Sequence, residues 1–349
     1  MRDLAKYAAG IVLAVALLAW VVRDADLGAV WQQLREASLP LIALCVVLNT
    51  GHNVFRAWRW RALLAPFRTA VPFRPMFVAI IVGYMTSWIV PGRLGELVRP
   101  MLLSARENVP LGPSLGSVVA DRMMDALAVV ALFAVGAWAT PLEGRAAEYA
   151  PLIRTGALTI AGVVVGVVVA MMLASRSSGR LDRWLDGKPR LLRWAGRSLV
   201  AVASGVEALR SPRLLAVVSI QSLFAWVTIA LATWCGILAS GVDIGLGPVL
   251  VITPLLVLGV AVPTPGGAGS YHGAMKVGLM LFGVPDVQAI SAGFLMHLVI
   301  VVPTVVLGML LIWVEGLSLR DLVASASQLR RLGSVPDAGR TQRALENAP

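Results

Sequence analysis

Long apolar runs dominate this 349-residue chain and limit what it can fold into. A helix of about 20 apolar residues crosses a lipid bilayer. Runs of that length occupy roughly residues 5–22, 39–62, 114–139, 152–174, 213–240 and 287–314. A water-soluble domain of this size cannot bury so much apolar surface in one core. The composition, 58% hydrophobic and 14% charged, agrees. The sequence therefore predicts an all-α polytopic membrane protein.

The first apolar run resembles a signal peptide, because Arg2 and Lys6 precede it. A cleavage site with two small residues does not follow; the chain continues with Val22, Arg23 and Asp24. We therefore expect residues 5–22 to be an uncleaved first span.

Two further apolar stretches, 75–105 and 247–283, are interrupted in the middle by proline and glycine. The interruptions are VPGRLG at 90–95 and VPTPGGAG at 262–269. Each half is about 11 to 16 residues long, which is too short to cross a bilayer. Two half-helices that meet inside the membrane are typical of a re-entrant hairpin, so we predict two such hairpins.

The charges between the apolar runs support this topology. The net charge of +11 is spread over short loops and does not form one patch for nucleic acid. If both broken segments are hairpins, the basic loops 56–74 and 175–213 lie on the cytoplasmic side, and the balanced loops 23–38 and 140–151 lie outside. The pattern predicts a multi-pass protein of the bacterial cytoplasmic (inner) membrane, with both termini in the cytoplasm.

The order of elements predicts an inverted repeat. Residues 39–140 and 213–314 each run span, hairpin, span, in opposite orientation. The two hairpin tips would then meet near the bilayer midplane, where secondary transporters bind substrate. We expect one transmembrane domain over residues 1–316, a basic surface helix over 189–209, and a partly disordered cytoplasmic tail over 317–349.

The first hairpin carries Arg93, Glu96 and Arg99, spaced three residues apart. On a helix these side chains share one face, and Glu96 can pair with either arginine. Two arginines beside a free helix N-terminus suit a phosphate group. The alternative is an ion pair that only locks the hairpin.

The third span carries Asp121, Arg122 and Asp125. The two aspartates are four residues apart and lie on one helix face. Ionisable side chains inside a membrane are costly and mark functional sites. The alternative is that they only neutralise Arg93 or Arg99.

The second hairpin ends in a glycine-rich turn followed by polar residues. The turn permits close backbone approach, and Ser270 is the expected N-cap of the next helix. His272 and Lys276 share one face and are expected to meet an anionic headgroup, with His272 a candidate proton relay. The alternative is hydrogen bonding between the tips. The predicted binding residues here are Gly266, Gly267, Tyr271, His272 and Lys276.

The remaining polar residues give weaker indications of a functional role. His52 and Arg56, four residues apart near the inner end of the second span, are candidate binding residues, although a snorkelling anchor that includes Arg59 is the simpler interpretation. His297 is expected to be a satisfied buried histidine, and Tyr84 to pack. Common catalytic and metal-binding motifs are absent from the sequence, so we expect a non-enzymatic protein without metal or cofactor.

Three motifs in this order carry a resemblance to a known family: PGRLGELVR at 91–99, DRMMD at 121–125, and PTPGGAG at 263–269. The chain resembles the lysylphosphatidylglycerol synthase transmembrane (flippase-like) family, the membrane half of the bacterial multiple peptide resistance factor, in a stand-alone form. The resemblance implies movement of lipid between leaflets, with the motif residues in the binding site. Such sequences often have an acidic residue where this chain has His272. We also expect the chain to lack the soluble aminoacyl-transfer domain, and therefore not to make lysylphosphatidylglycerol itself.

We therefore expect a transporter or flippase for an anionic phospholipid or lipid-linked intermediate. Two alternatives belong to other classes. One is a membrane enzyme that transfers a sugar or aminoacyl group on a lipid carrier, and the other is a non-catalytic scaffold for a lipid synthase. The expected partners are an anionic membrane lipid and, beyond it, a second copy of the chain or a lipid synthase.

Overall fold

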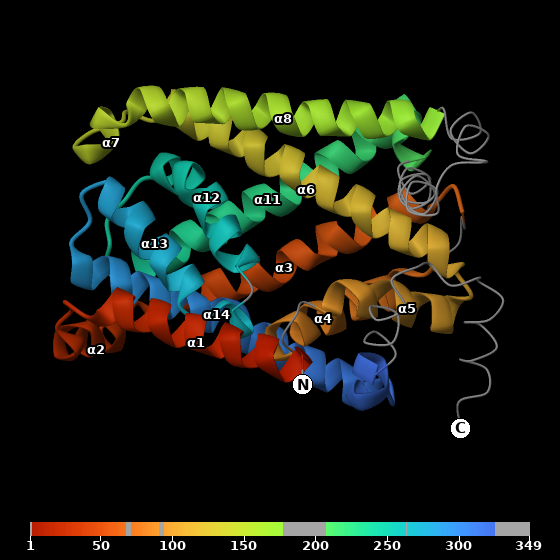
Figure 1. Cartoon of the computed structure of the whole chain (residues 1–349), viewed down its shortest axis with the longest axis horizontal. Helices are drawn as coiled ribbons and strands as arrows, with labels where there is room; N and C mark the ends of the chain where they lie inside the picture. The colour runs from red at the N-terminus through yellow and green to blue at the C-terminus, as the bar shows by residue number, and fades with distance from the viewer. Residues whose placement is uncertain (1, 68–70, 91–93, 177–206, 263, 325–349) are drawn as a thin grey trace.

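The computed structural model describes residues 2–67, 71–90, 94–176, 207–262 and 264–324, and every regular element in these ranges is helical (Figure 1). The long helices run roughly along one axis of the molecule. The elements are α1 Arg2–Val22, α2 Leu27–Arg35, α3 Leu39–Leu64, α4 Phe73–Ile89, α5 Gly95–Glu107, α6 Leu111–Ala139, α7 Arg145–Glu148, α8 Ala150–Arg176, η1 Glu207–Arg210, α11 Pro212–Ala239, α12 Leu246–Ala261, η2 Pro265–Gly267, α13 Ser270–Leu281 and α14 Asp286–Val314.

Four helices are long and apolar enough to cross a membrane: α3, α8, α11 and α14. The chain is therefore a multi-pass membrane protein. Helix α6 has 29 residues but carries Asp121, Arg122 and Asp125, which lower its hydropathy. The first expected span corresponds to α1. It is followed by α2, whose N-cap is Asp26, and the two helices form a bent pair with an angle of 89° between them. By length and composition the described chain has four or five candidate spans, against the six expected from the sequence.

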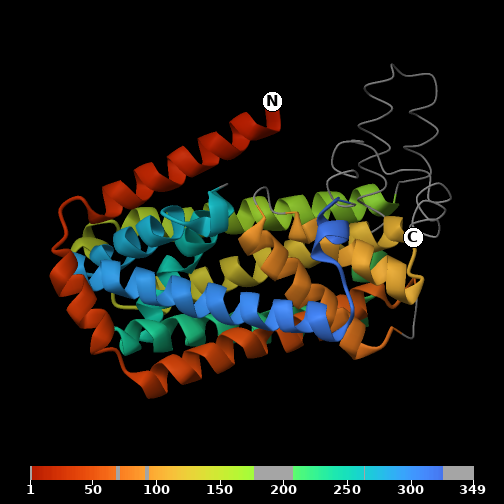
Figure 2. The same ribbon diagram turned by 90° about the horizontal axis from the view of Figure 1, so that it is seen from below.

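Helix α1 lies on the outside of the bundle and diverges from it toward the N-terminus (Figure 2). Its C-terminal half packs against α13. Its exposed side chains, such as Ile11, Val12 and Val15, are apolar and suit contact with lipid.

The two broken segments form helical hairpins. Helices α4 and α5 pack together, as do α12 and α13, and the breaks fall at 90–94 and 262–269 as the sequence predicts. In the first hairpin Gly83 faces Gly95 so closely that a Cβ at Gly95 would overlap with the Gly83 carbonyl oxygen. In the second, a Cβ at Gly259 would lie 2.7 Å from the Cβ of Ala274. Glycine therefore permits both close crossings.

Each hairpin has both ends at one end of the molecule, and the two hairpins open in opposite directions (Figure 1). Arg74 at the start of α4 and Arg106 near the end of α5 both pair with Glu315, directly after α14. The hydrogen bond from Arg106 lowers the pKa of Glu315. Lys276, in the second half of the other hairpin, instead donates to the Val21 carbonyl at the end of α1.

The hairpin tips meet inside the bundle. Helix α4 contacts η2, and a Cβ at Gly266 would lie 3.4 Å from the Trp88 carbonyl oxygen. Each hairpin also has its own apolar core, and α3 and α14 contribute to both cores. The predicted surface helix at 189–209 lies almost entirely outside the described residues, as does the tail from 325 onward. Before that point Leu317 and Leu322 still pack on the core of the first hairpin.

Candidate functional site

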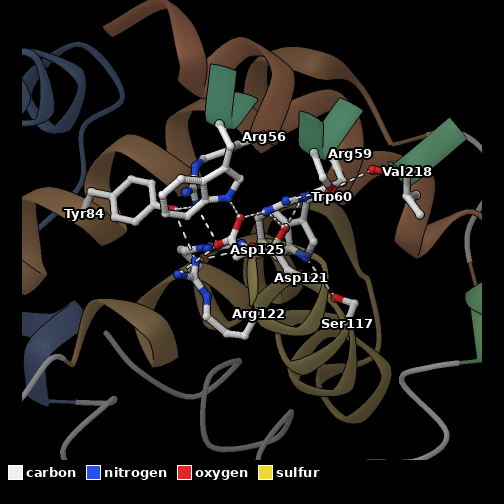
Figure 3. A network of polar contacts seen from close by, with 12 residues as sticks. Arg56, Arg59, Trp60, Tyr84, Ser117, Asp121, Arg122, Asp125 and Val218 are labelled. Atoms are coloured by element: carbon white, nitrogen blue, oxygen red, sulfur yellow. Dashed lines mark hydrogen bonds and ion pairs between the residues drawn. The ribbon is translucent and has the colours of Figure 1, made fainter. Parts of the chain in front are cut away.

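The centre of the candidate site is the pair of aspartates on α6. Asp121 and Asp125 lie one helical turn apart, both are buried, and they face α3. A carboxylate inside a bilayer needs a cation or several hydrogen bonds. Four arginines, from α3, α5 and α6, supply these contacts. We name these six residues the charged cluster: Arg56, Arg59, Arg99, Asp121, Arg122 and Asp125. Figure 3 labels all of them except Arg99.

Arg59 is the structural centre of the charged cluster and is fully buried. Its Nη2 lies 2.6 Å from Asp121 Oδ1 and 2.8 Å from Asp125 Oδ1, and its Nη1 donates to Ser222 Oγ on α11 at 3.0 Å. One guanidinium thus bridges both carboxylates and connects three helices. The snorkelling interpretation of Arg59 is wrong, because α3 continues to Leu64 and keeps this turn inside the protein.

Arg56 pairs with Asp125, and Arg99 pairs with Asp121. Arg56 Nη1 lies 3.0 Å from Asp125 Oδ2, so Arg56 is not a surface anchor either. Arg99 Nη2 lies 3.1 Å from Asp121 Oδ2, and its guanidinium lies over the Trp60 ring at 4.7 Å. The α5 helix is thereby connected to α6 and α3.

Arg122 is the most exposed member of the charged cluster. Its guanidinium reaches Asp125 Oδ2 at 3.2 Å and Asp121 Oδ2 at 3.3 Å. The sequence predicted the pairing with Asp125. The Arg122 side chain is 35% exposed, whereas the other three arginines are at most 7% exposed. A ligand that reaches the cluster therefore meets Arg122 first.

Two aromatic residues complete the cluster. The Tyr84 hydroxyl contacts Arg56 and lies 3.2 Å from Arg122 Nη2. Trp226 on α11 donates from Nε1 to Asp125 Oδ1 at 2.8 Å. Tyr84 is thus a polar member of the site, although the sequence predicted only a packing role for it.

The charged cluster has an excess of positive charge. Four arginines stand against two aspartates, and Glu96, outside the cluster, adds one negative charge near Arg122, which leaves one positive charge without a carboxylate among the described residues. The Nε atoms of Arg56, Arg99 and Arg122 are buried and have no hydrogen-bond partner within the described ranges. Uncompensated charge in a low-dielectric interior attracts an anion strongly. Arginine in particular suits a phosphate, which it can bind with two parallel hydrogen bonds.

Other predicted residues of this half are placed differently. Arg93 lies outside the described residues. Glu96 is half-buried and acts electrostatically on Arg122, whereas Arg99 pairs with Asp121 and not with Glu96. His52 lies one turn before Arg56, and its Nδ1 is buried with no hydrogen-bond partner in the part of the chain that the structure describes. The structure therefore brings Arg56, Arg99, Asp121, Arg122 and Asp125 together and places His52 outside their contacts.

The tip of the second hairpin is a separate polar region. Gly266 and Gly267 have positive φ angles of 58° and 66°, which favours glycine at both positions. The N-cap of α13 is Gly269, one residue before the predicted Ser270. The Gly269 amide donates to His272 Nδ1, and Ser270 Oγ donates to the Gly267 carbonyl. Tyr271 is buried and stacks on His297.

Lys276 does not join the arginines. Its Nζ lies 2.8 Å from Asp286 Oδ1 and 2.9 Å from the Val21 carbonyl. It lines a cavity of about 1000 Å³ between α1, α6, α8, α12 and α13. The charged residues on the cavity wall carry both signs, three basic and three acidic: Arg23, Arg145, Lys276, Asp24, Glu148 and Asp286. This cavity therefore lacks the positive excess of the charged cluster.

The sequence contained a signal for Arg59, which the prediction had left out of the site. Arg56 and Arg59 on α3 are three residues apart, and Asp121 and Asp125 on α6 are four apart. Both spacings place a charge pair on one helix face, and two buried acids need cations of matching spacing. Trp226 had no comparable signal, because only the packing of α11 brings its indole to Asp125.

Two similarities to known proteins accompany this geometry. The chain is 27% identical over 354 aligned residues to the glycosyltransferase AglD of Haloferax volcanii, across 92% of this chain and 56% of that protein. It therefore spans about half the length of that curated relative. Residues 7–308 match the family described as the lysylphosphatidylglycerol synthase TM region. Because the match includes both hairpins and the whole charged cluster, the chain belongs to the lysylphosphatidylglycerol synthase TM region family.

Proposed function

We propose that this protein binds an anionic lipid at the charged cluster and moves it between the leaflets of the membrane. The observation that carries the proposal is the positive excess of a buried cluster with one partly exposed arginine, Arg122. A lipid phosphate would supply the missing negative charge. Its acyl or prenyl chains would stay in the surrounding lipid.

The arrangement of the hairpins supports a transport role. Two hairpins that open toward opposite ends, with tips in contact, fit a protein that exposes one polar path to either side of a membrane. On this proposal both hairpins are re-entrant and both termini face the cytoplasm of a bacterial inner membrane. The charged cluster then lies in the inner-leaflet half, and the cavity beside Lys276 in the outer half.

The description of the family agrees with a phospholipid substrate. That description concerns a synthase of an aminoacylated phospholipid, and the name of the similar protein concerns a glycosyltransferase. An enzymatic role in transferring a sugar on a lipid carrier is the second candidate. The similarity to the glycosyltransferase favours it, and product formation by the purified chain from a sugar donor would distinguish it.

The test of the proposal is lipid movement in liposomes. The purified chain is reconstituted with a fluorescent phosphatidylglycerol, and the fraction quenched by a membrane-impermeant reductant is followed over time. We expect the wild type to accelerate exchange between leaflets for phosphatidylglycerol more than for a matched phosphatidylcholine. Arg122→Gln should lose that preference and keep its fold, because the remaining three arginines still balance both aspartates.

The matched control is Arg61→Gln, which removes an exposed arginine two residues after Arg59 on α3. We expect this variant to behave as the wild type. Equal exchange in protein-free liposomes and wild-type liposomes would reject the transport proposal. Equal anion preference in Arg122→Gln and wild type would reject the charged cluster as its site.

A further inference from the structure

Two imidazoles face each other where the second hairpin tip meets α14. The ring centroids of His272 on α13 and His297 on α14 are 4.6 Å apart, with the ring planes nearly perpendicular at 83°. His272 is 2% exposed. Ionisable side chains inside a membrane protein are energetically costly, so a packed pair of histidines is a candidate functional site.

Backbone contacts determine which nitrogen of each ring carries hydrogen. The Gly266 carbonyl can only accept, so His297 donates to it from Nε2, at 2.8 Å, and its Nδ1 holds the lone pair. The Gly269 amide can only donate, so the lone pair of His272 lies on Nδ1, at 3.3 Å, and its Nε2 carries the hydrogen. A further proton therefore adds to His297 Nδ1, because the lone pair of His272 is already engaged.

Among the described residues, the side chains around the two rings offer no negative charge to such a proton. Tyr271 and Phe294 contact the pair from α13 and α14, and Trp88 contacts His297 from α4. Helix α1 packs on the same turn of α13 through Ala14, Leu17 and Trp20.

The remaining charged group on this side of α13 is Lys276, which is already neutralised by Asp286. Helix α12 meets α13 here through Gly259, and α3 contributes Cys45 to the core around Tyr271. Within the described residues neither imidazole has an ion pair. Protonation would therefore create an isolated cation beside the N-terminus of α13, where the helix dipole already favours an anion.

We infer that His297, packed against His272, is a proton-binding site that is occupied together with an anionic headgroup. The inference rests on the proposed function, since it names the ion that moves with the lipid. A singly charged phosphodiester and one proton are neutral together. The headgroup and the proton therefore cross the low-dielectric tip together at lower cost than either charge alone. The proton adds to His297 Nδ1 on one side of the membrane and leaves from the same atom to water on the other.

The first test measures proton uptake directly. The full chain in weakly buffered detergent solution is mixed with short-chain phosphatidylglycerol, and a pH indicator reports protons removed from solution. We expect uptake of about one proton per protein in the wild type and none in His297→Gln, whose amide still donates to Gly266. His52→Gln removes the one histidine of the chain that lies outside the pair, and this variant should keep the proton uptake. No uptake in the wild type, or equal uptake in His297→Gln, would overturn the inference.

The second test separates the inference from the proposed function. In the liposome assay a pH gradient should change the initial rate of phosphatidylglycerol exchange severalfold in the wild type, and leave His297→Gln unaffected. His272→Asn keeps an acceptor for Gly269 and should retain the gradient dependence. Wild-type exchange that ignores the gradient would overturn the proton site and leave the proposed function standing. Proton uptake without any exchange would overturn the transport proposal and keep the binding site.

Discussion

The arginines of the charged cluster differ in how many neighbours depend on them. Arg59 bridges both aspartates and Ser222, whereas Arg122 shares the same aspartates from the edge of the cluster. Removing one partner of a buried ion pair leaves an uncompensated charge. Burial therefore separates a structural arginine from a ligand-facing one within a single cluster.

Arg59→Ala should destabilise the protein by about 3–5 kcal/mol, because Asp121 and Asp125 lose their common partner. Thermal unfolding of the detergent-purified protein, followed by intrinsic tryptophan fluorescence, measures the change. Arg61→Ala on the same helix is the control and should change stability by at most about 0.5 kcal/mol. A midpoint of Arg59→Ala equal to that of the control would show that Arg56 and Arg99 suffice to hold the aspartates.

At the scale of the element, the hairpins depend on glycine contacts between their two halves. Gly83 and Gly95 bring α4 and α5 into backbone contact, and this contact directs Arg99 toward α6. The tips then meet through Trp88 and Gly266. Helix separation in the first hairpin would therefore also displace a member of the charged cluster.

Gly95→Ala should prevent correct packing of the first hairpin, because the new methyl group would overlap with the Gly83 carbonyl oxygen. We expect a loss of more than about 3 kcal/mol, at the upper end of overpacking effects, and a low yield of monodisperse protein by size-exclusion chromatography. Gly51→Ala is the matched control, since a methyl group there meets nothing within 4 Å. A normal yield for Gly95→Ala would mean that the hairpin tolerates a wider crossing.

At the scale of the whole molecule, local signals in the sequence predicted the fold better than the site. Proline and glycine cluster at 90–95 and 262–269, and clusters of this kind interrupt a helix, so both breaks were confirmed. The pairing of Glu96 with Arg99 was also inferred from local spacing, and there the distant Asp121 is the observed partner. Tyr84 and Trp226 enter the site through packing between helices, which no spacing within one helix reveals.

The proposed topology predicts which positions face the outside of the cell. In a variant without the two native cysteines, single cysteines at Glu143, Asp243 and Pro285 should react with an impermeant maleimide on intact cells. A cysteine at Ala105 should react only after permeabilisation. Asp243 and Pro285 flank the second hairpin, so labelling of both from outside supports re-entry. Labelling of these two from opposite sides would make that segment a full crossing.

The charged cluster also constrains how the protein enters the membrane during synthesis. Helix α3 carries Arg56 and Arg59 in its C-terminal half, and an arginine costs up to about 2.5–3.5 kcal/mol to insert, the value at a helix centre. Their carboxylate partners lie on α6, some sixty residues later in the chain. When α3 leaves the ribosome, no partner has yet been made. The insertion machinery must therefore hold this helix in a wet or protein-lined environment until α6 arrives. A nascent chain that ends before α6 should remain with the translocon or be degraded.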